Sequence, residues 1–212
     1  SLGYRAYLVA GLDASKFTAA DGLRKGRYKG NKSKAEDLAG VARLEYATSA
    51  GISLGVTGYY GGADHSTNGA YDVKVGMGVA DARFKRAGFD LRGVFARVQV
   101  DGAEDAAILS SQNVGEAMQG WYGEAAYDLL RRDAKEDSRR SLFVFARYER
   151  FNTQEETPSA YTADPANDRE VITGGFSFRP IEKVAFKTDF EHWEDGADQT
   201  LDRFNLGAAF MF

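Results

Sequence analysis

RFNLGAAFMF, residues 203–212, alternates apolar side chains with small or polar ones. In an extended strand, successive side chains point to opposite faces, so the apolar residues share one face. These residues are Phe204, Leu206, Ala208, Phe210 and Phe212. The segment therefore predicts a β-strand with one apolar face and an aromatic end.

The same two-residue period recurs along the whole chain. We expect ten strands, at 2–12, 38–48, 51–61, 71–86, 89–101, 119–130, 140–152, 169–179, 183–193 and 203–212. In 71–86 and 89–101 the alternation changes parity partway, which predicts a β-bulge in each segment. The predicted fold class is all-β.

Each predicted strand has an apolar face, as in Leu44, Ile52, Val144 and Phe186, and an opposite face with charges in mid-strand. A soluble β-sandwich also alternates, with its apolar side chains packed inward. The alternation by itself therefore leaves a sandwich and a membrane barrel open.

The connections favour a barrel because they alternate in length. Long connections are expected at 13–37, 62–70, 102–118, 153–168 and 194–202. Short or intermediate ones are expected at 49–50, 87–88, 131–139 and 180–182. Up-and-down barrels of the bacterial outer membrane have this arrangement, with short turns on the periplasmic side. We therefore predict a transmembrane antiparallel β-barrel as the single domain, 1–212.

Aromatic residues support this prediction because they fall near both ends of the predicted strands, as membrane-interface belts do. The expected outer belt contains Tyr59, Tyr60, Trp121, Tyr148, Phe151, Phe190, Trp193 and Phe204. The expected inner belt contains Tyr46, Phe84, Phe89, Tyr127, Phe178, Phe210 and Phe212.

The final strand resembles the outer-membrane insertion signal, which has a polar residue, a glycine and a terminal aromatic at fixed spacing. Asn205, Gly207, Phe210 and Phe212 match that spacing. The resemblance implies recognition by the barrel-assembly machinery.

Several stretches resemble bacterial outer-membrane porins of the phosphate-selective porin (O and P) superfamily and its uncharacterised relatives. They are 11–46, GWYGEAAYDLL (120–130), FARYERFNTQ (145–154), 164–192 and the final strand. The resemblance implies a 16-stranded homotrimer in the outer membrane that contacts lipid and lipopolysaccharide and passes small polar solutes by diffusion. With ten strands, the chain is interpreted as the C-terminal portion of such a porin; a complete ten-stranded barrel is the alternative.

The charged face would line the pore, and its basic residues are the first candidates for solute contact. They are Arg43, Arg83, Lys85, Arg92, Arg147 and Lys187. In a wide pore they would polarise a constriction. In a narrow barrel they would instead pair across the interior, and any one of them could simply be a solvated wall residue.

The 13–37 connection is rich in lysine and arginine, including Arg24, Lys25, Arg27 and Lys29. Within it, FTAADGLRKG (17–26) could form a short helix. We hypothesise that this loop enters the lumen as a basic constriction that favours anions. An exposed loop facing solvent or lipopolysaccharide phosphates is the alternative.

Other chemistry has weaker support. The chain has no cysteine and a net charge of −4, so neither a thiolate metal site nor nucleic-acid binding is expected. The acidic loops 164–170 and 194–202 could hold Ca²⁺ but lack EF-hand spacing. We predict no cofactor, no metal and no catalytic residue, because His192 and Glu191 point to opposite faces and His65 lies in an expected flexible loop. A small closed barrel with a structural, adhesive or hydrolytic rim role is the alternative function.

Overall fold

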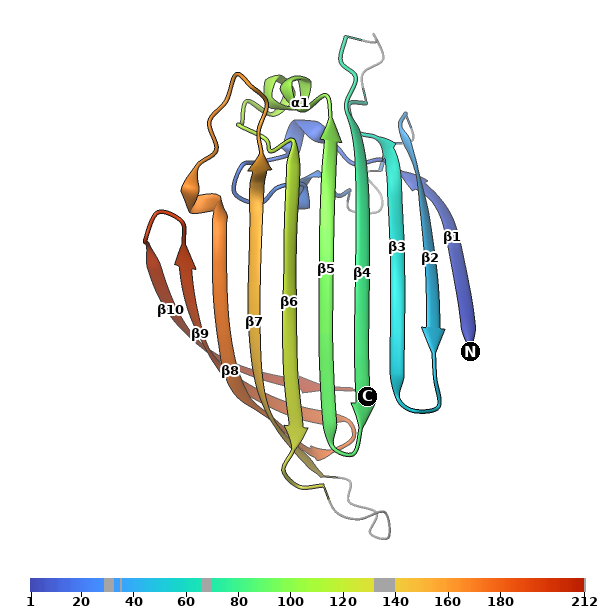
Figure 1. Cartoon of the computed structure of the whole chain (residues 1–212), viewed down its shortest axis with the longest axis vertical. Coiled ribbons are helices and arrows are strands. Elements are labelled where there is room, and N and C mark those ends of the chain that lie inside the picture. The colour runs from blue at the N-terminus through green and yellow to red at the C-terminus, as the bar shows by residue number, and fades with distance from the viewer. Residues whose placement is uncertain (29–32, 35, 66–69, 132–139, 212) are drawn as a thin grey trace.

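A computed structural model describes residues 1–28, 33–34, 36–65, 70–131 and 140–211. Ten antiparallel strands form one sheet in which each strand pairs with its neighbours in the chain (Figure 1). They are β1 (Leu2–Ala10), β2 (Leu38–Ala47), β3 (Ile52–Gly62), β4 (Lys74–Arg86), β5 (Phe89–Asp101), β6 (Ala117–Asp128), β7 (Ser141–Glu156), β8 (Asp168–Ile181), β9 (Val184–Asp195) and β10 (Thr200–Phe210). The predicted all-β, up-and-down strand order is confirmed.

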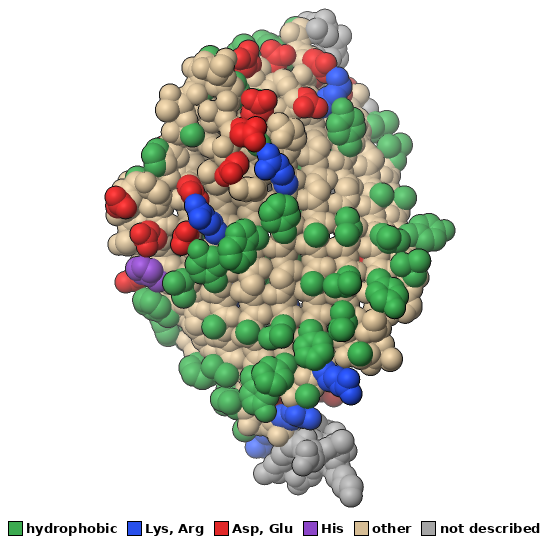
Figure 2. Space-filling model, in the orientation of Figure 1, with side chains coloured by type: hydrophobic (Ala, Val, Ile, Leu, Met, Phe, Trp, Pro, Cys, Tyr) green, Lys and Arg blue, Asp and Glu red, His purple; other side chains and the backbone are tan. Residues whose placement is uncertain are grey.

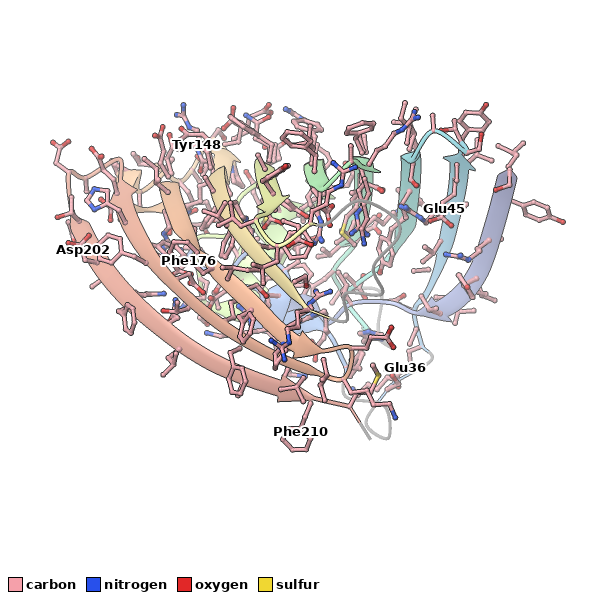
Figure 3. All side chains as sticks on the ribbon, turned by 90° about the horizontal axis from the view of Figure 1, so that it is seen from below. Glu36, Glu45, Tyr148, Phe176, Asp202 and Phe210 are labelled. Carbon is pink, nitrogen blue, oxygen red and sulfur yellow. The ribbon has the colours of Figure 1, made fainter. Side chains whose placement is uncertain are left out.

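The sheet curves into an open arc, with β1 and β10 as its two edges (Figure 3). Within the described residues, β1 pairs only with β2 and β10 only with β9. A closed ten-stranded barrel is therefore not formed by these strands alone. Both edge strands are exposed along almost their whole length.

The convex face of the sheet is apolar and uncovered. Leu44 is 53% exposed and Phe186 49% exposed, Ile52 is also exposed, and Val144 on the same face is half-buried. Figure 2 shows this face as a broad band of hydrophobic side chains, with mainly acidic residues above it and Lys or Arg below. A sandwich would cover such a face with a second sheet, so the sandwich alternative is excluded for this part of the chain.

Most predicted belt aromatics lie on the convex face. The three exceptions are Tyr59, Phe151 and Trp193. Tyr59 is opposite Met77, and Phe151 contacts Trp193 edge-on, with ring centroids 6.3 Å apart. By strand register, all three aromatics face the concave side. Placing them in the outer belt was wrong, because the prediction used only their height along the strand and ignored its parity.

The predicted bulges in the fourth and fifth strands are also wrong. Register is continuous from Lys74 to Arg86 against β5, and shifts occur instead between β6 and β7 and between β8 and β9. The change of parity has another cause: at the upper end of the sheet the concave face is itself apolar. Val75 and Val100 are buried there against the connection between β1 and β2, residues 11–37, which we call the 11–37 connection.

This upper concave cluster joins the long connections to the sheet. Phe17, Val73, Val75, Val100 and Val114 are almost completely buried in it, with alanines of the helix α1 (Ala103–Ser110). Acidic residues in the first turn of α1 suit a helix N-terminus. The cluster therefore fixes the connections over the inner side of the arc, where Figures 1 and 3 show the first of them.

The 11–37 connection crosses the concave side from one part of the sheet to another. The Ala14 amide donates to the Ala63 carbonyl beside β3, and Arg169 Nη1 of β8 donates to the Ala20 carbonyl (3.1 Å). The predicted helix over 17–26 is wrong: two 3₁₀ turns, η1 (Ala14–Lys16) and η2 (Arg24–Gly26), flank a turn that is closed by a bridge between Thr18 and Gly22.

The expected long connection at 194–202 is a tight turn. Strands β9 and β10 remain paired up to Glu194 and Thr200. Asp195 Oδ1 accepts hydrogen bonds from the amides of Ala197 (2.9 Å) and Gln199 (3.1 Å), which stabilises the reversal. Charged residues suggested a loop, but here they cap a turn. No helix in the described part of the chain is long and apolar enough to cross a bilayer.

Candidate functional site

A hollow of about 250 Å³ lies on the concave face, below the apolar cluster and between β4 and β9. Its basic lining residues are Arg83, Lys85, Arg92, Arg179 and Lys187. Its acidic lining residues are Asp90 and Glu124. Among the described residues, positive charge therefore exceeds negative charge around the hollow.

The β4–β5 hairpin positions the centre of this site. Its two turn residues, Ala87 and Gly88, both have positive φ (57° and 86°), as a tight two-residue hairpin requires. The resulting register puts Arg83 directly opposite Arg92 and Lys85 opposite Asp90. Two like charges face each other on adjacent strands, an arrangement that needs a compensating group.

Asp90 is that group. The residue is only 5% exposed, and its carboxylate receives two hydrogen bonds from each guanidinium. The closest are from Arg83 Nη2 (2.6 Å) and Arg92 Nη2 (2.9 Å) to Oδ2. Paired, charge-assisted bonds of this kind fix both guanidinium planes. Asp90 therefore holds the two arginines in place on the wall of the hollow.

Two phenyl rings form the opposite wall. Lys187 Nζ lies 4.9 Å from the centroid of the Phe145 ring, and the Arg179 guanidinium lies 5.8 Å from that of Phe143. Phe145 lies between Ala126 and Gly175 on the concave face, so small residues flank it on both sides. The hollow thus combines cations with aromatic surface.

All six predicted pore-lining residues lie on the concave face, as their register requires. Arg43 Nη1 reaches from β2 across β3 to Asp81 Oδ2 of β4 (2.6 Å). It can do so because Gly55 lies between them; a Cβ there would be 2.2 Å from the Arg43 Nη2 atom. Arg147 pairs with Glu149 and stacks on Tyr122. Their role in solute contact stays a prediction.

The predictions missed Phe143, Phe145 and Arg179 as members of the site. All three have odd numbers in strands whose even-numbered residues carry the apolar face. Their odd numbers place them on the concave face. The prediction did not use this, because it assigned aromatic residues to the lipid-facing side.

Several cations of the basic loop pair with acids of the same loop. Lys25 Nζ lies 2.7 Å from Asp21 Oδ2, and Lys16 pairs with Asp13. Burial disfavours the charged form of Asp13, but hydrogen bonds from Lys16 and Ser15 outweigh this and lower the pKa of its carboxyl. Arg24, Lys25 and Arg27 are exposed, and the predicted Lys29 lies outside the described residues. A basic constriction made by this loop stays a prediction.

His65 is packed, although the sequence suggested a flexible loop. Its side chain is 4% exposed and meets the Tyr28 ring edge-on, with centroids 5.3 Å apart. The backbone amide of His65 donates to Asp37 Oδ2 (2.7 Å). Burial, followed by the negative charge of Asp13, raises the pKa of Tyr28 to about 12. These contacts attach the end of β3 to the 11–37 connection.

His192 has an acidic partner that was not predicted, because only Glu191, its neighbour in the chain, was considered. Its Nδ1 lies 2.6 Å from Asp202 Oδ1, on the adjacent strand β10. Glu191 faces the other side of the sheet, as expected. Because His192 is opposite Ile172, the pair lies on the convex face. The β9–β10 register would have revealed the pair.

The other predicted sites have structural roles. Asp164 caps the 3₁₀ turn η4 (Pro165–Asn167) by accepting from the Ala166 amide (3.0 Å). Among the described residues, no group of three or more acidic or histidine side chains is placed to hold a metal ion. In the predicted insertion signal, Asn205 Nδ2 donates to Asp189 Oδ1 (2.9 Å), Phe210 points outward in Figure 3, and Phe212 lies outside the described residues.

Comparison with known proteins gives three results. No family model matches the chain. An uncharacterized protein of Aquifex aeolicus (strain VF5) is 28% identical over 224 residues, which cover all of this chain and 50% of that protein. LpxR from Salmonella typhimurium superposes with a TM-score of 0.41 at 12% identity, covering 83% of this chain and 73% of that one. A likeness of this degree does not identify an activity.

Proposed function

We propose that this chain forms part of the wall of a bacterial outer-membrane β-barrel whose concave side lines an aqueous passage for small anions. The observation that carries the proposal is the division of one curved sheet into an uncovered apolar convex face and a charged concave face. Soluble monomers rarely expose an apolar surface of this extent, whereas a lipid-facing wall must. The surplus of basic side chains around the hollow favours anions.

The free edges of β1 and β10 indicate how the barrel is completed. Unpaired strand edges are not tolerated in the hydrocarbon region, because no water is present to satisfy their amides and carbonyls. Further strands must therefore join the two edges. The chain spans half the length of the Aquifex relative, so strands in the rest of such a protein would suffice. A 16-stranded, trimeric barrel related to phosphate-selective porins remains a prediction.

Lys85 and its neighbour Arg86 provide a matched test of the passage. Both are exposed on β4, but Lys85 faces the hollow and Arg86 faces the convex side. In planar bilayers, Lys85→Glu should lower the chloride-to-potassium permeability ratio by a factor of about two to five, because a charge near the solute path changes by two units. Arg86→Glu should leave the ratio unchanged. Equal effects of the two variants would contradict a lumen on the concave side.

The His192–Asp202 pair supports a second candidate function, hydrolysis at the rim. A histidine oriented by a carboxylate can act as a general base, and this pair lies on the face that we assign to lipid. If the barrel is a lipid hydrolase, His192→Ala should reduce fatty-acid release from outer-membrane vesicles by at least about a hundredfold, and Asp202→Asn by less. Unchanged release, or none from the unaltered protein, would reject this function.

A further inference from the structure

We propose that the concave hollow selects organic anions that carry an aromatic or other flat apolar body, such as arylcarboxylates, over inorganic anions of the same charge. This inference rests on the proposed passage, because it names the solute class of the same site. It starts from the composition of the hollow, which places Phe143 and Phe145 next to its cations.

The cations of the hollow differ in how much of their charge is already compensated. Arg83 and Arg92 share the buried carboxylate of Asp90. Lys187 Nζ lies 3.3 Å from Asp189 Oδ2, a looser pair, and its side chain is 55% exposed. Lys187 is therefore the cation that can turn toward an incoming carboxylate at the lowest cost, and the side chain of Arg179 is likewise exposed.

Those same two cations cover the phenyl rings. Lys187 lies over Phe145 and Arg179 over Phe143. A flat anion entering the hollow would draw the two cations off the rings with its carboxylate. Its own ring would then pack against Phe143, which is partly exposed, and against the small exposed part of Phe145 (8%). A small hydrated anion such as phosphate can use only the first contact.

The hollow is also the right size and shape for such a ligand. Its volume of about 250 Å³ exceeds that of a bare inorganic anion and leaves space for a small flat ligand. On one side of Phe145, Ala126 has only a methyl side chain, so a larger side chain there would narrow the hollow. On the other side, β9 closely covers the position of Gly175, because a Cβ there would lie 2.3 Å from the Thr188 carbonyl oxygen.

Equilibrium binding tests this inference without requiring conduction. The full chain in detergent is titrated with 4-fluorobenzoate and with 3-fluoropropionate, and the fluorine NMR signal gives both dissociation constants. We expect fluorobenzoate to bind about tenfold more tightly, because aromatic contact adds about one power of ten. Phe143→Leu/Phe145→Leu should bring the ratio close to one, whereas Arg179→Gln/Lys187→Gln should weaken both ligands by a similar factor.

Phe95→Leu on the convex face is the matched control, and it should leave both constants unchanged. Competition by inorganic phosphate should require at least about tenfold more phosphate than benzoate. Equal affinity for the two carboxylates, or a ratio that the double leucine variant does not change, would overturn the inference. The proposed passage is judged separately by the permeability ratio of the Lys85 variant, so failure of one is distinguishable from failure of the other.

Discussion

Replacing Ala125 with arginine is expected to block stable insertion of the barrel wall, whereas arginine at the adjacent Ala126 is expected to be tolerated. Ala125 is exposed on the convex face, between Leu91 and Ala146 on the neighbouring strands. On a lipid-facing strand, an arginine near the bilayer midplane costs about 2–4 kcal/mol. That is a large part of the stability of a typical domain.

Ala126 is the matched control because it differs from Ala125 only in the direction of its side chain. It lies on the concave face opposite Asp90 and Phe145, and a guanidinium there can reach water and the carboxylate of Glu124. Heat-modifiable migration on gels and resistance to urea extraction from membranes measure insertion of both variants. If both insert equally well, the convex face does not contact lipid and the proposed barrel fails.

Replacing Phe17 with alanine is expected to release the 11–37 connection from the concave face. Phe17 is completely buried, and its ring packs so closely on Gly26 that a Cβ there would lie 2.4 Å from Cε1. Loss of a buried phenylalanine costs about 3–5 kcal/mol of packing, partly through the cavity it leaves. Because Phe17 is the largest fully buried side chain among the described residues and belongs to the connection, the connection should detach while the strands stay paired.

Two measurements report this release. Trypsin should cleave after the exposed Arg24 and Lys25 at least about tenfold faster, since faster local opening exposes the segment. Single-channel conductance should increase, because the connection lies over the inner side of the arc. Phe95→Ala, on the convex face, should change neither. A Phe17→Ala protein with unaltered cleavage and conductance would show that the cluster does not hold the connection.

The prediction of the sheet succeeded because its signal is local. Alternation in segments such as 203–212 depends only on neighbouring residues, and it gave ten strands and their order. The errors arose at the upper end of the sheet, where the concave face is covered by a connection. Val75 and Val100 are apolar on the concave side because a connection packs on them. In the sequence, these apolar residues change the parity of the alternation, and that change led to the prediction of a bulge that the register does not show.

The prediction of the site was less complete because side-chain partners come from other strands. Arg83 and Arg92 were assigned to the charged face, but Asp90 as their shared partner depends on the hairpin register. His192 was judged against Glu191, its neighbour in sequence, although its partner Asp202 is ten residues away and directly opposite.

The sequence by itself determined the strands, their antiparallel order and which side chains share a face, because the period of two is imposed by the geometry of a single extended chain. Only the tertiary structure decided what meets each face: the connection over the upper concave side, the cations and phenyl rings around the hollow, and the two unpaired edges. The reason is physical. Contacts between strands depend on register and on chain reversal over long distances, and neither is fixed by the residues of one strand.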